Sequence, residues 1–257
     1  MEKKEQKLKI KNILVSQPQP VDFEKSPFSE IAKKYNVNFE FNKFIKIEGI
    51  TSSDFRKDNK ITILDYTAVI FNSKNAVDHF FRLCKEMRIE IPDAMKYFCI
   101  SESTAYYLQK YVQFRKRKIF HGKEDVNQLI EIIKKHREEN FLFPCSDIHN
   151  DKLPQLLDES EIKYTKAIMY RTVPSNLSTV NIYQYDMLVF FSPAGIDSLF
   201  INFPDFKQGN IAIAAMGPTT SKAVKDSGLT LNISAPTTTA PSISMAIEEY
   251  LQKITKK

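Results

Sequence analysis

Two stretches of this chain follow one pattern and decide its fold: Tyr66-Thr-Ala-Val-Ile-Phe-Asn-Ser-Lys-Asn-Ala-Val-Asp-His-Phe-Phe81 and Tyr185-Asp-Met-Leu-Val-Phe-Phe-Ser-Pro-Ala-Gly-Ile-Asp-Ser-Leu-Phe200. Tyr, Phe, Ser, Asp and Phe coincide in register, and most positions between them match in apolar character. Each stretch is typical of a buried strand, a serine at a turn, and a helix with an apolar face. Two copies of this unit predict two similar α/β lobes, and we expect function in a cleft between them.

A second repeated feature follows each copy. Ser101-Glu-Ser-Thr-Ala105 comes after an apolar run at 97–100, and Gly217-Pro-Thr-Thr-Ser221 comes after a run at 211–216. Short continuous apolar runs of this kind are typical of parallel strands that are covered on both faces. The same patterns predict strands at 12–15, 118–120 and 141–143, helices at 27–35, 102–111, 124–136, 151–160 and 243–254, and a loop over 234–242.

Two segments with alternating polar and apolar residues, 38–49 and 163–173, bracket the middle third of the chain. The simplest path starts one lobe, crosses on the first segment, builds the other lobe, and returns on the second segment. The predicted fold class is therefore α/β, with two Rossmann-like parallel-sheet lobes joined by a two-stranded antiparallel linker. The expected bounds are 1–36 and 174–257 for a discontinuous first lobe, 37–50 and 162–173 for the linker, and 51–161 for the second lobe.

Composition limits the class of protein. The chain has 257 residues, of which 42% are hydrophobic, enough for two medium domains. It has no run of the ~20 apolar residues that a membrane span needs, and its first residues are charged where a signal peptide is apolar. Three widely spaced cysteines, without Cys-x-x-Cys, argue against disulfides and structural zinc, so we expect a cytoplasmic protein.

The formal charge of +6 has two readings, a solvated surface or a nucleic-acid footprint. Much of the excess lies near the chain ends, and one internal cluster is Arg115-Lys-Arg-Lys118. No aromatic-interleaved basic motif accompanies it, so we expect no nucleic-acid partner. A mild positive potential suits a small polyanionic ligand better.

Several catalytic motifs are absent from the sequence. It has neither Gly-x-Gly-x-x-Gly nor a P-loop pattern, and Ser73 and Ser192 lack the flanking glycines of a nucleophile elbow. The four histidines, His79, His121, His136 and His149, show no metal-binding spacing. We expect His79, His121 and His149 to be surface or cap residues.

Small hydroxylic residues stand instead at several expected strand-to-helix turns. They are Ser73, the Ser101/Ser103/Thr104 group, Ser146, Ser192, and the Thr219/Thr220 pair. A helix N-terminus has unpaired N–H groups and a partial positive charge, so it binds carboxylates well. Taken singly, each of these residues is an ordinary helix cap. Five such turns in two related lobes predict a ligand with several carboxylates.

Four motifs, in order along the chain, resemble the uroporphyrinogen-III synthase family. Phe71-Asn-Ser-Lys-Asn-Ala-Val77 is similar to the family's Phe-Thr-Ser-x-Asn-Ala-Val, and Phe190-Phe-Ser-Pro-Ala-Gly195 to its Phe-Phe-Ser-Pro-Ser-Gly. Met216-Gly-Pro-Thr-Thr220 resembles its Ile-Gly-Pro-Thr-Thr, and Met169-Tyr-Arg-Thr-Val-Pro174 its Val-Tyr-x-Thr segment.

The resemblance implies a cofactor-free, monomeric hydro-lyase of haem biosynthesis that closes hydroxymethylbilane to uroporphyrinogen III and inverts the terminal pyrrole ring. It leaves open a transient contact with hydroxymethylbilane synthase. The implied catalytic residue is Tyr170, whose other reading is a tyrosine that packs on a linker strand. The implied substrate-binding residues are Ser73, Asn75, Ser103, Thr104, Ser146, Ser192, Pro193, Ala194, Gly195, Gly217, Thr219 and Thr220.

Two places depart from the family pattern. Ser101-Glu102 stands where the family usually has glycine, and the loop 145–152 lacks the usual Gly and Arg. These departures keep open a non-catalytic or regulatory member of the same fold. A second alternative is a two-lobed protein that binds a small ligand, because two α/β lobes with paired crossings also describe such proteins, although the expected lack of an export signal counts against it.

Overall fold

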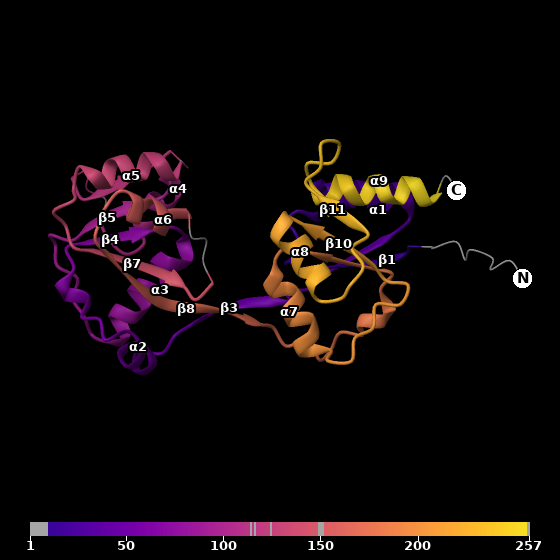
Figure 1. The fold of residues 1–257 in the computed structure, drawn as a ribbon, viewed down its shortest axis with the longest axis horizontal. Helices are drawn as coiled ribbons and strands as arrows, with labels where there is room; N and C mark the ends of the chain where they lie inside the picture. Colours follow the sequence, from indigo (N-terminus) through magenta and orange to yellow (C-terminus); the bar gives the residue numbers. More distant parts are fainter. Residues whose placement is uncertain (1–9, 114, 116, 124, 149–151, 256–257) are drawn as a thin grey trace, which may run out of the picture. The chain divides into compact units, whose positions relative to one another are not determined.

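The computed structural model describes residues 10–113, 115, 117–123, 125–148 and 152–255. Positions 124, 149 and 151, and Lys116 of the basic cluster, lie outside the described residues. The chain divides into two compact units, the first formed by Met1–Lys46 with Val173–Lys257 and the second by Ile47–Thr172. Each unit has its own sheet and its own core (Figure 1).

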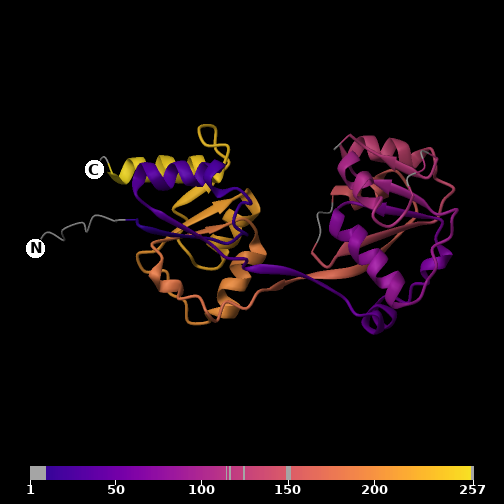
Figure 2. The same ribbon diagram turned by 180° about the vertical axis from the view of Figure 1, so that it is seen from behind.

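The first unit contains a five-stranded sheet in the order β11-β10-β9-β1-β2, in which all neighbours are parallel. Helices α1 and α9 cover one face of this sheet and helices α7 and α8 the other (Figures 1 and 2). Its elements are β1 (Asn12–Val15), α1 (Pro27–Tyr35), β2 (Asn38–Phe41), β9 (Met187–Phe190), α7 (Pro193–Asn202), β10 (Ala212–Met216), α8 (Pro218–Asp226), β11 (Ile233–Ala235) and α9 (Ile243–Thr255), with short 3₁₀ turns at Phe23–Lys25 and Ile182–Gln184.

The second unit holds a six-stranded sheet in the order β3-β8-β7-β4-β5-β6, and the strands from β8 to β6 are parallel. Helices α2, α3 and α4 pack on one face, and α5 and α6 pack on the other. Its elements are β3 (Ile45–Gly49), α2 (Ser52–Asn59), a 3₁₀ turn (Ile63–Asp65), β4 (Ala68–Phe71), α3 (Lys74–Glu86), β5 (Lys96–Cys99), α4 (Glu102–Leu108), β6 (Ile119–His121), α5 (Val126–Lys134), β7 (Phe141–Ser146), α6 (Lys152–Glu159) and β8 (Tyr164–Pro174).

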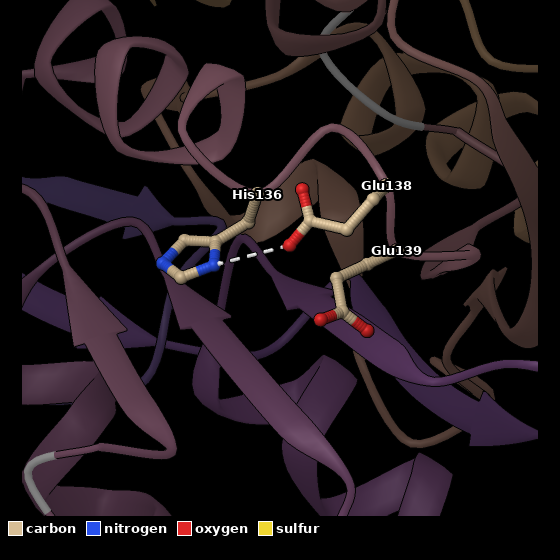
Figure 3. A group of neighbouring side chains, drawn as sticks. All are labelled: His136, Glu138 and Glu139. Carbon is tan, nitrogen blue, oxygen red and sulfur yellow. Dashed lines mark ion pairs between the residues drawn. The ribbon is translucent and has the colours of Figure 1, made fainter.

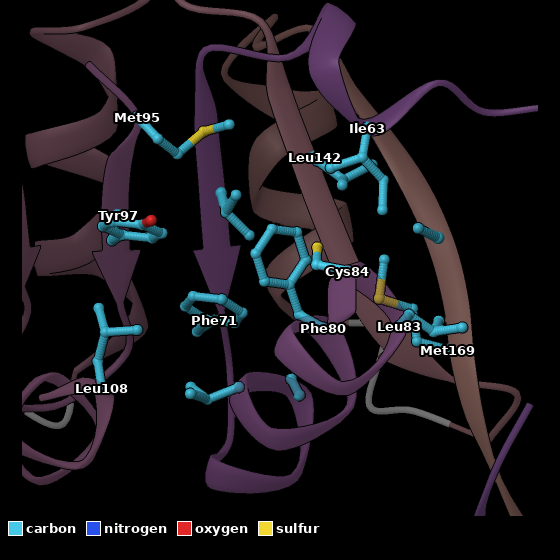
Figure 4. Close-up of a cluster of buried hydrophobic side chains, with 14 of the residues drawn as sticks. Ile63, Phe71, Phe80, Leu83, Cys84, Met95, Tyr97, Leu108, Leu142 and Met169 are labelled. Carbon is cyan, nitrogen blue, oxygen red and sulfur yellow. The ribbon is translucent and has the colours of Figure 1, made fainter. Parts of the chain in front are cut away.

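The core beneath α3 is rich in aromatic rings. Phe71 of β4 and Phe80 of α3 are both fully buried and meet edge to face with centroids 5.6 Å apart (Figure 4). An aromatic pair in this arrangement adds about 1 kcal/mol to the burial of its apolar area. The packing fixes α3 against β4, and it therefore fixes the turn between them.

Strands β3 and β8 are neighbours and carry the chain from one unit to the other. The backbone N–H of Ile50 donates to Met169, and that of Ser175 donates to Phe44. Because the partners appear in opposite order along the chain, the two strands are antiparallel, as predicted for the linker.

The expected strands and helices differ from the structure at several places. The predicted strand at 38–49 is two strands, since β2 pairs with β1 inside the first sheet and β3 starts only at Ile45. Residues 233–235 form β11, although a loop was expected from 234. Helix α4 ends at Leu108 rather than at 111, and α5 ends at Lys134 rather than at 136.

The start of α1 also differs in detail. Ser26 occupies the N-cap position, but its hydroxyl donates to the Phe23 carbonyl instead of accepting from the first turn. Among the described residues, no helix is both long and apolar enough to cross a membrane.

Candidate functional site

Both sheets reverse their strand order at one point. In the first unit the chain passes from β1 outward to β2 and resumes beyond β1 with β9. In the second unit it passes from β4 through β5 and β6 and resumes beyond β4 with β7. Open α/β sheets bind ligands at the carboxyl ends of their strands at such a reversal. The residues there are Ser16 and Ser192 in the first unit, and Ser73 and Ser146 in the second.

Ser73 and Tyr170 meet at the reversal point of the second unit. Ser73 is the N-cap of α3, and its Oγ accepts from the N–H of Ala76 at 3.1 Å. The hydroxyls of Ser73 and Tyr170 are hydrogen-bonded at 3.3 Å, although the residues lie 97 positions apart. Ser146 is paired in register with Tyr170 where β7 meets β8. The structure thus brings together three residues that the sequence analysis proposed.

Tyr170 stays protonated in this environment. The residue is 5% exposed, and burial raises the pKa of its phenol, an effect that the hydrogen bond with Ser73 opposes in part. A neutral phenol that is held at a strand end can donate a hydrogen bond to a ligand.

His79 of α3 packs against Tyr170. The two rings are stacked with centroids 4.9 Å apart and 18° between their planes. Arg82 Nε donates to His79 Nδ1 at 3.2 Å, so Nδ1 is an acceptor and the imidazole is neutral with its proton on Nε2. Burial, and then the positive charge of Arg82, lower the pKa of His79, which keeps the ring in this form.

Arg82 joins α3 to both crossing segments. Its Nη2 donates to the carbonyls of Ile50 at 2.8 Å and Met169 at 3.3 Å, and its Nη1 pairs with Glu86 at 2.6 Å. A Cβ on Gly49 would lie 2.6 Å from the guanidinium carbon. Glycine at position 49 therefore leaves the space that Arg82 needs to hold the backbone beside Tyr170.

Two polar residues beside these turns were not predicted from the sequence. Asn72 Oδ1, directly before Ser73, is buried without a hydrogen-bond partner, which is true of no other side-chain N or O atom among the described residues. Asp147 Oδ1 accepts from Ser146 Oγ at 2.8 Å, and from the N–H groups of Ile148 and Thr172 at 2.9 and 3.1 Å. Asp147 thereby fixes the end of β7 against β8.

Ser146 does not begin a helix, contrary to the expectation. It is the last residue of β7, and α6 starts only at Lys152. Its hydroxyl is bonded to Asp147 within the same turn. Asn75, the next proposed residue of this unit, is exposed in the first turn of α3.

Ser192 heads the matching turn of the first unit. It is the N-cap of α7 and accepts from the N–H of Gly195 at 3.3 Å, with Pro193 and Ala194 in the first helical turn. A Cβ on Gly195 would lie 3.4 Å from the Phe190 ring and 3.8 Å from Ser16 Oγ. The turns after β1 and β9 are therefore adjacent, and Ser16 joins the group although the sequence analysis did not select it.

The turn before α8 has no side-chain cap, so its free N–H groups belong to the backbone alone. Gly217 is the N-cap with φ +91°, a conformation that L side chains rarely adopt, and it offers no side-chain cap. Thr220 is 1% exposed and Thr219 is exposed, so the two hydroxyls have different surroundings. Neither threonine caps the helix, as both lie within its first turn.

The turn before α4 is the least suited to a carboxylate. Ser101 caps the seven-residue helix, and its Oγ is bonded to the hydroxyls of Ser103 at 3.0 Å and Thr104 at 3.1 Å. Glu102 places a negative charge in the first turn, where it offsets the helix dipole. The hydroxyls of Ser103 and Thr104 are thus both hydrogen-bonded to Ser101 at this turn.

Three acid–base side chains come together elsewhere in the second unit. The side chains of His136, Glu138 and Glu139 offer ligand atoms within 4.8 Å of one another, a cluster that the spacing of histidines did not predict (Figure 3). His136 Nδ1 lies 3.8 Å from Glu138, while Glu139 is paired with Lys96 at 2.5 Å. Burial raises the pKa of Glu139, but the hydrogen bonds from Lys96 and Thr67 outweigh it and hold the pKa below its usual value. The pairing with Lys96 thus accounts for the position of Glu139 in this cluster.

The three cysteines are free and buried. Burial raises the pKa of Cys84 and Cys99 to about 12 and that of Cys145 to about 11. A thiol at such a pKa is a poor nucleophile at neutral pH.

The two sheets define a class of protein: a two-unit α/β protein with hydroxyl-bearing turns at the carboxyl ends of its parallel strands. Residues 41–244 match the family model described as uroporphyrinogen-III synthase HemD. The chain belongs to the uroporphyrinogen-III synthase family, whose enzymes act in haem biosynthesis.

Solved structures agree on the fold. The uroporphyrinogen-III synthetase of Helicobacter pylori is 17% identical with a TM-score of 0.58, over 95% of this chain and 100% of that one. A mutant uroporphyrinogen III synthase of Thermus thermophilus is 12% identical with a TM-score of 0.50, over 96% of this chain and 100% of that one. The prediction of two parallel-sheet lobes is confirmed.

Proposed function

We propose that this chain is a cyclising hydro-lyase that converts hydroxymethylbilane to uroporphyrinogen III, and that Tyr170 assists the loss of the hydroxyl. The observation that carries the proposal is the hydroxyl pair of Tyr170 and Ser73 at the reversal point of the second sheet, 3.3 Å apart. Family membership supports the substrate and the product.

The reaction removes one water and forms one ring. The C–O bond of the terminal hydroxymethyl group breaks, and the hydroxyl leaves with a proton as water, which gives a cationic azafulvene. The terminal pyrrole attacks this carbon through its already substituted position and forms a spiro intermediate. The bond between the spiro carbon and its original methylene bridge then breaks. That methylene bonds to the free α-carbon on the other side of the pyrrole nitrogen, and loss of the proton from this carbon restores the pyrrole with its ring inverted.

Tyr170 assists as a hydrogen-bond donor to the departing hydroxyl. Because burial raises the pKa of its phenol, Tyr170 keeps its proton at neutral pH. Stabilisation of the leaving oxygen by a positioned donor typically contributes a factor of about 10² or more. Ser73 holds the phenol oxygen in place through the hydroxyl pair.

His79 and Arg82 act as positioning residues. His79 covers one face of the Tyr170 ring, and Arg82 holds His79 by donating to its Nδ1. Since the backbone carbonyl of Met169 is also bonded to Arg82, the strand that carries Tyr170 is held at the preceding residue. An ordered ring loses less freedom when the substrate binds, which favours turnover.

Carboxylates of the substrate bind at the hydroxyl-headed turns of each sheet. In the first unit these groups are Ser192 to Gly195 and Gly217 to Thr220, and in the second they are Ser73 and Asn75, with Ser146, Ser103 and Thr104 as further contacts. The helix dipoles of α3, α7 and α8 supply partial positive charge at their N-termini.

The setting of the reaction follows from its chemistry. Three free thiols suit a reducing compartment, so we place the chain in the cytoplasm. It acts as a monomer without a cofactor. An unstable substrate favours direct transfer, in a transient contact with hydroxymethylbilane synthase.

A second candidate function is a regulatory member of the family without activity. The observation that favours it is Glu102 in the first turn of α4, where a negative charge repels a carboxylate. Such a member would bind the linear substrate or the macrocycle without changing the ratio of product isomers.

One assay separates the two candidates. Hydroxymethylbilane is generated in situ, the chain is added, the product is oxidised, and type I and type III uroporphyrin are separated by chromatography. Type III product above the chain-free control supports the enzyme. Type I product alone, together with measurable binding, supports the regulatory alternative.

A further inference from the structure

The second unit has a cavity of about 490 Å³ away from the turns described above. It lies at the start of β5 and β6, where Met95, Tyr97 and Ile119 form part of its wall. The turns proposed for the substrate follow the other ends of these parallel strands. From Tyr97 to Ser101 the separation along the strand is roughly 13 Å. The cavity is therefore separate from the carboxyl-end turns.

The Tyr97 hydroxyl is an unused polar group in this wall. The side chain is 4% exposed, and no hydrogen bond links it to any described residue. Among the described residues, Asn72 Oδ1 is the one side-chain N or O atom that is both fully enclosed and without a partner. The Tyr97 oxygen also has no partner, so it is not fully enclosed. The oxygen of Tyr97 is thus open toward the cavity, while the ring packs in the core (Figure 4). A buried hydroxyl of this kind favours a ligand that supplies its hydrogen-bond partner.

The aromatic wall is preformed. Phe81 and Tyr111 both line the cavity, and their rings are stacked with centroids 4.5 Å apart and 2° between their planes. Tyr111 is held from its far end, because its hydroxyl donates to Asp78 at 2.6 Å. A flat, fixed pair of rings favours a planar aromatic ligand that packs in contact with it.

The charged side chains at the rim differ in whether they have an ion-pair partner. Glu90, Asp93, Arg115 and Lys118 all line the cavity, and Arg115 lies 4.0 Å from Asp93. Lys118 is half-buried and makes no ion pair with any residue in the described ranges. It is therefore the cation best able to pair with an acidic group of a ligand.

We propose that this cavity is a second binding site, which takes a planar aromatic monocarboxylate whose ring packs against Phe81 and Tyr111, whose carboxylate pairs with Lys118, and which accepts a hydrogen bond from Tyr97. The residues involved have no part in the cyclisation. The same site assigns a role to Lys118, which the proposed function leaves unused. The site holds whether or not the chain cyclises a bilane.

Isothermal titration of the whole chain with 2-naphthoate tests this site, and 2-naphthalenemethanol is the neutral control ligand of the same shape. The expected result is binding of 2-naphthoate, weakened about threefold to tenfold by Tyr97→Phe, since one hydrogen bond is lost. Lys118→Met weakens it about twofold to fivefold, the range of a partly exposed ion pair. Lys134→Met, which removes an exposed lysine of α5, leaves the affinity unchanged.

Three results would overturn the proposal. They are the absence of heat with 2-naphthoate at millimolar concentration, equal affinity for the neutral control, and an affinity that neither variant changes. Circular dichroism melting of each variant shows whether it is folded at the temperature of the titration. Tyr97→Phe keeps the buried ring, so its fold is expected to survive.

Discussion

The imidazole of His79 lies flat on the phenol ring of Tyr170, with the two centroids 4.9 Å apart and the planes 18° from parallel. The two residues come from α3 and β8, and Arg82 bonds to both His79 and the backbone before Tyr170. This contact makes Tyr170 a held group rather than a loose surface tyrosine. Substitution of Tyr170 and of His79 can therefore test the donor and its positioning separately.

Tyr170→Phe is expected to lower turnover by roughly 10- to 100-fold, because the donor to the leaving hydroxyl is lost while the ring stays. The measurement is the initial rate of type III formation at saturating substrate. Tyr164→Phe, on the same strand β8, is the matched control and should stay close to the native rate. An unchanged rate in Tyr170→Phe would remove Tyr170 from the mechanism.

His79→Ala is expected to lower turnover by roughly threefold to tenfold, because Tyr170 loses the ring that covers its face. The KM should change less than the turnover, since His79 itself binds no carboxylate. His79→Phe restores a flat ring and should recover most of the rate. If Phe at position 79 is no better than Ala, the stacked contact does not position Tyr170.

Ser192→Ala and Thr220→Val are each expected to raise the KM by roughly threefold to tenfold, with a smaller effect on turnover, because each weakens a carboxylate-binding turn. Thr51→Ala is the matched control, since Thr51 caps α2 by accepting from the N–H of Asp54 at 3.1 Å. Loss of the cap costs about 1 kcal/mol of stability at Ser192 and at Thr51 alike. A fall in turnover without a rise in KM would contradict the assigned role.

The free energy of unfolding should fall more steeply below pH 6.5 in the native chain than in His79→Phe. Burial and Arg82 lower the pKa of His79 in the folded state below its ordinary value of 6.5. As the pH falls through 6.5, the unfolded chain takes up a proton that the folded chain resists, so stability is lost; above that pH both states are neutral and the effect vanishes. Protonation at Nδ1 would also break the bond from Arg82.

Urea unfolding at pH 7.5 and pH 5.5 measures this effect as the difference between native chain and variant. Subtracting the change in unfolding free energy of the variant from that of the native chain removes the contribution of the other titrating groups. Equal losses of stability in the two proteins would show that His79 has the same pKa folded and unfolded.

Local sequence signals predicted the caps well. Ser73 and Ser192 each stand between a continuous apolar run and a helix, and each caps that helix. The signal failed at Ser146, because α6 begins six positions later, at Lys152, and the hydroxyl of Ser146 is bonded to Asp147 instead. It also failed at 38–49, since the alternation of β2 and β3 runs on across the intervening residues although the two strands lie in different sheets.

Contacts between distant residues could not be predicted in this way. His79 and Tyr170 are 91 positions apart, and no local sequence pattern around either residue predicts their contact. The sequence around Ser16 does not indicate a helix cap, because two prolines follow closely after it instead of a helix. Only the strand order places Ser16 beside Ser192, and strand order is a property of the whole sheet.

The isomer ratio of the product tests the central claim most directly. Freshly made hydroxymethylbilane is divided among increasing concentrations of the native chain, and the fraction of type III uroporphyrin is measured after oxidation. The account predicts that this fraction rises with the concentration of the chain until type III dominates, and that Tyr170→Phe needs far more protein to reach the same fraction. A product that stays type I at every concentration of a folded chain would contradict it.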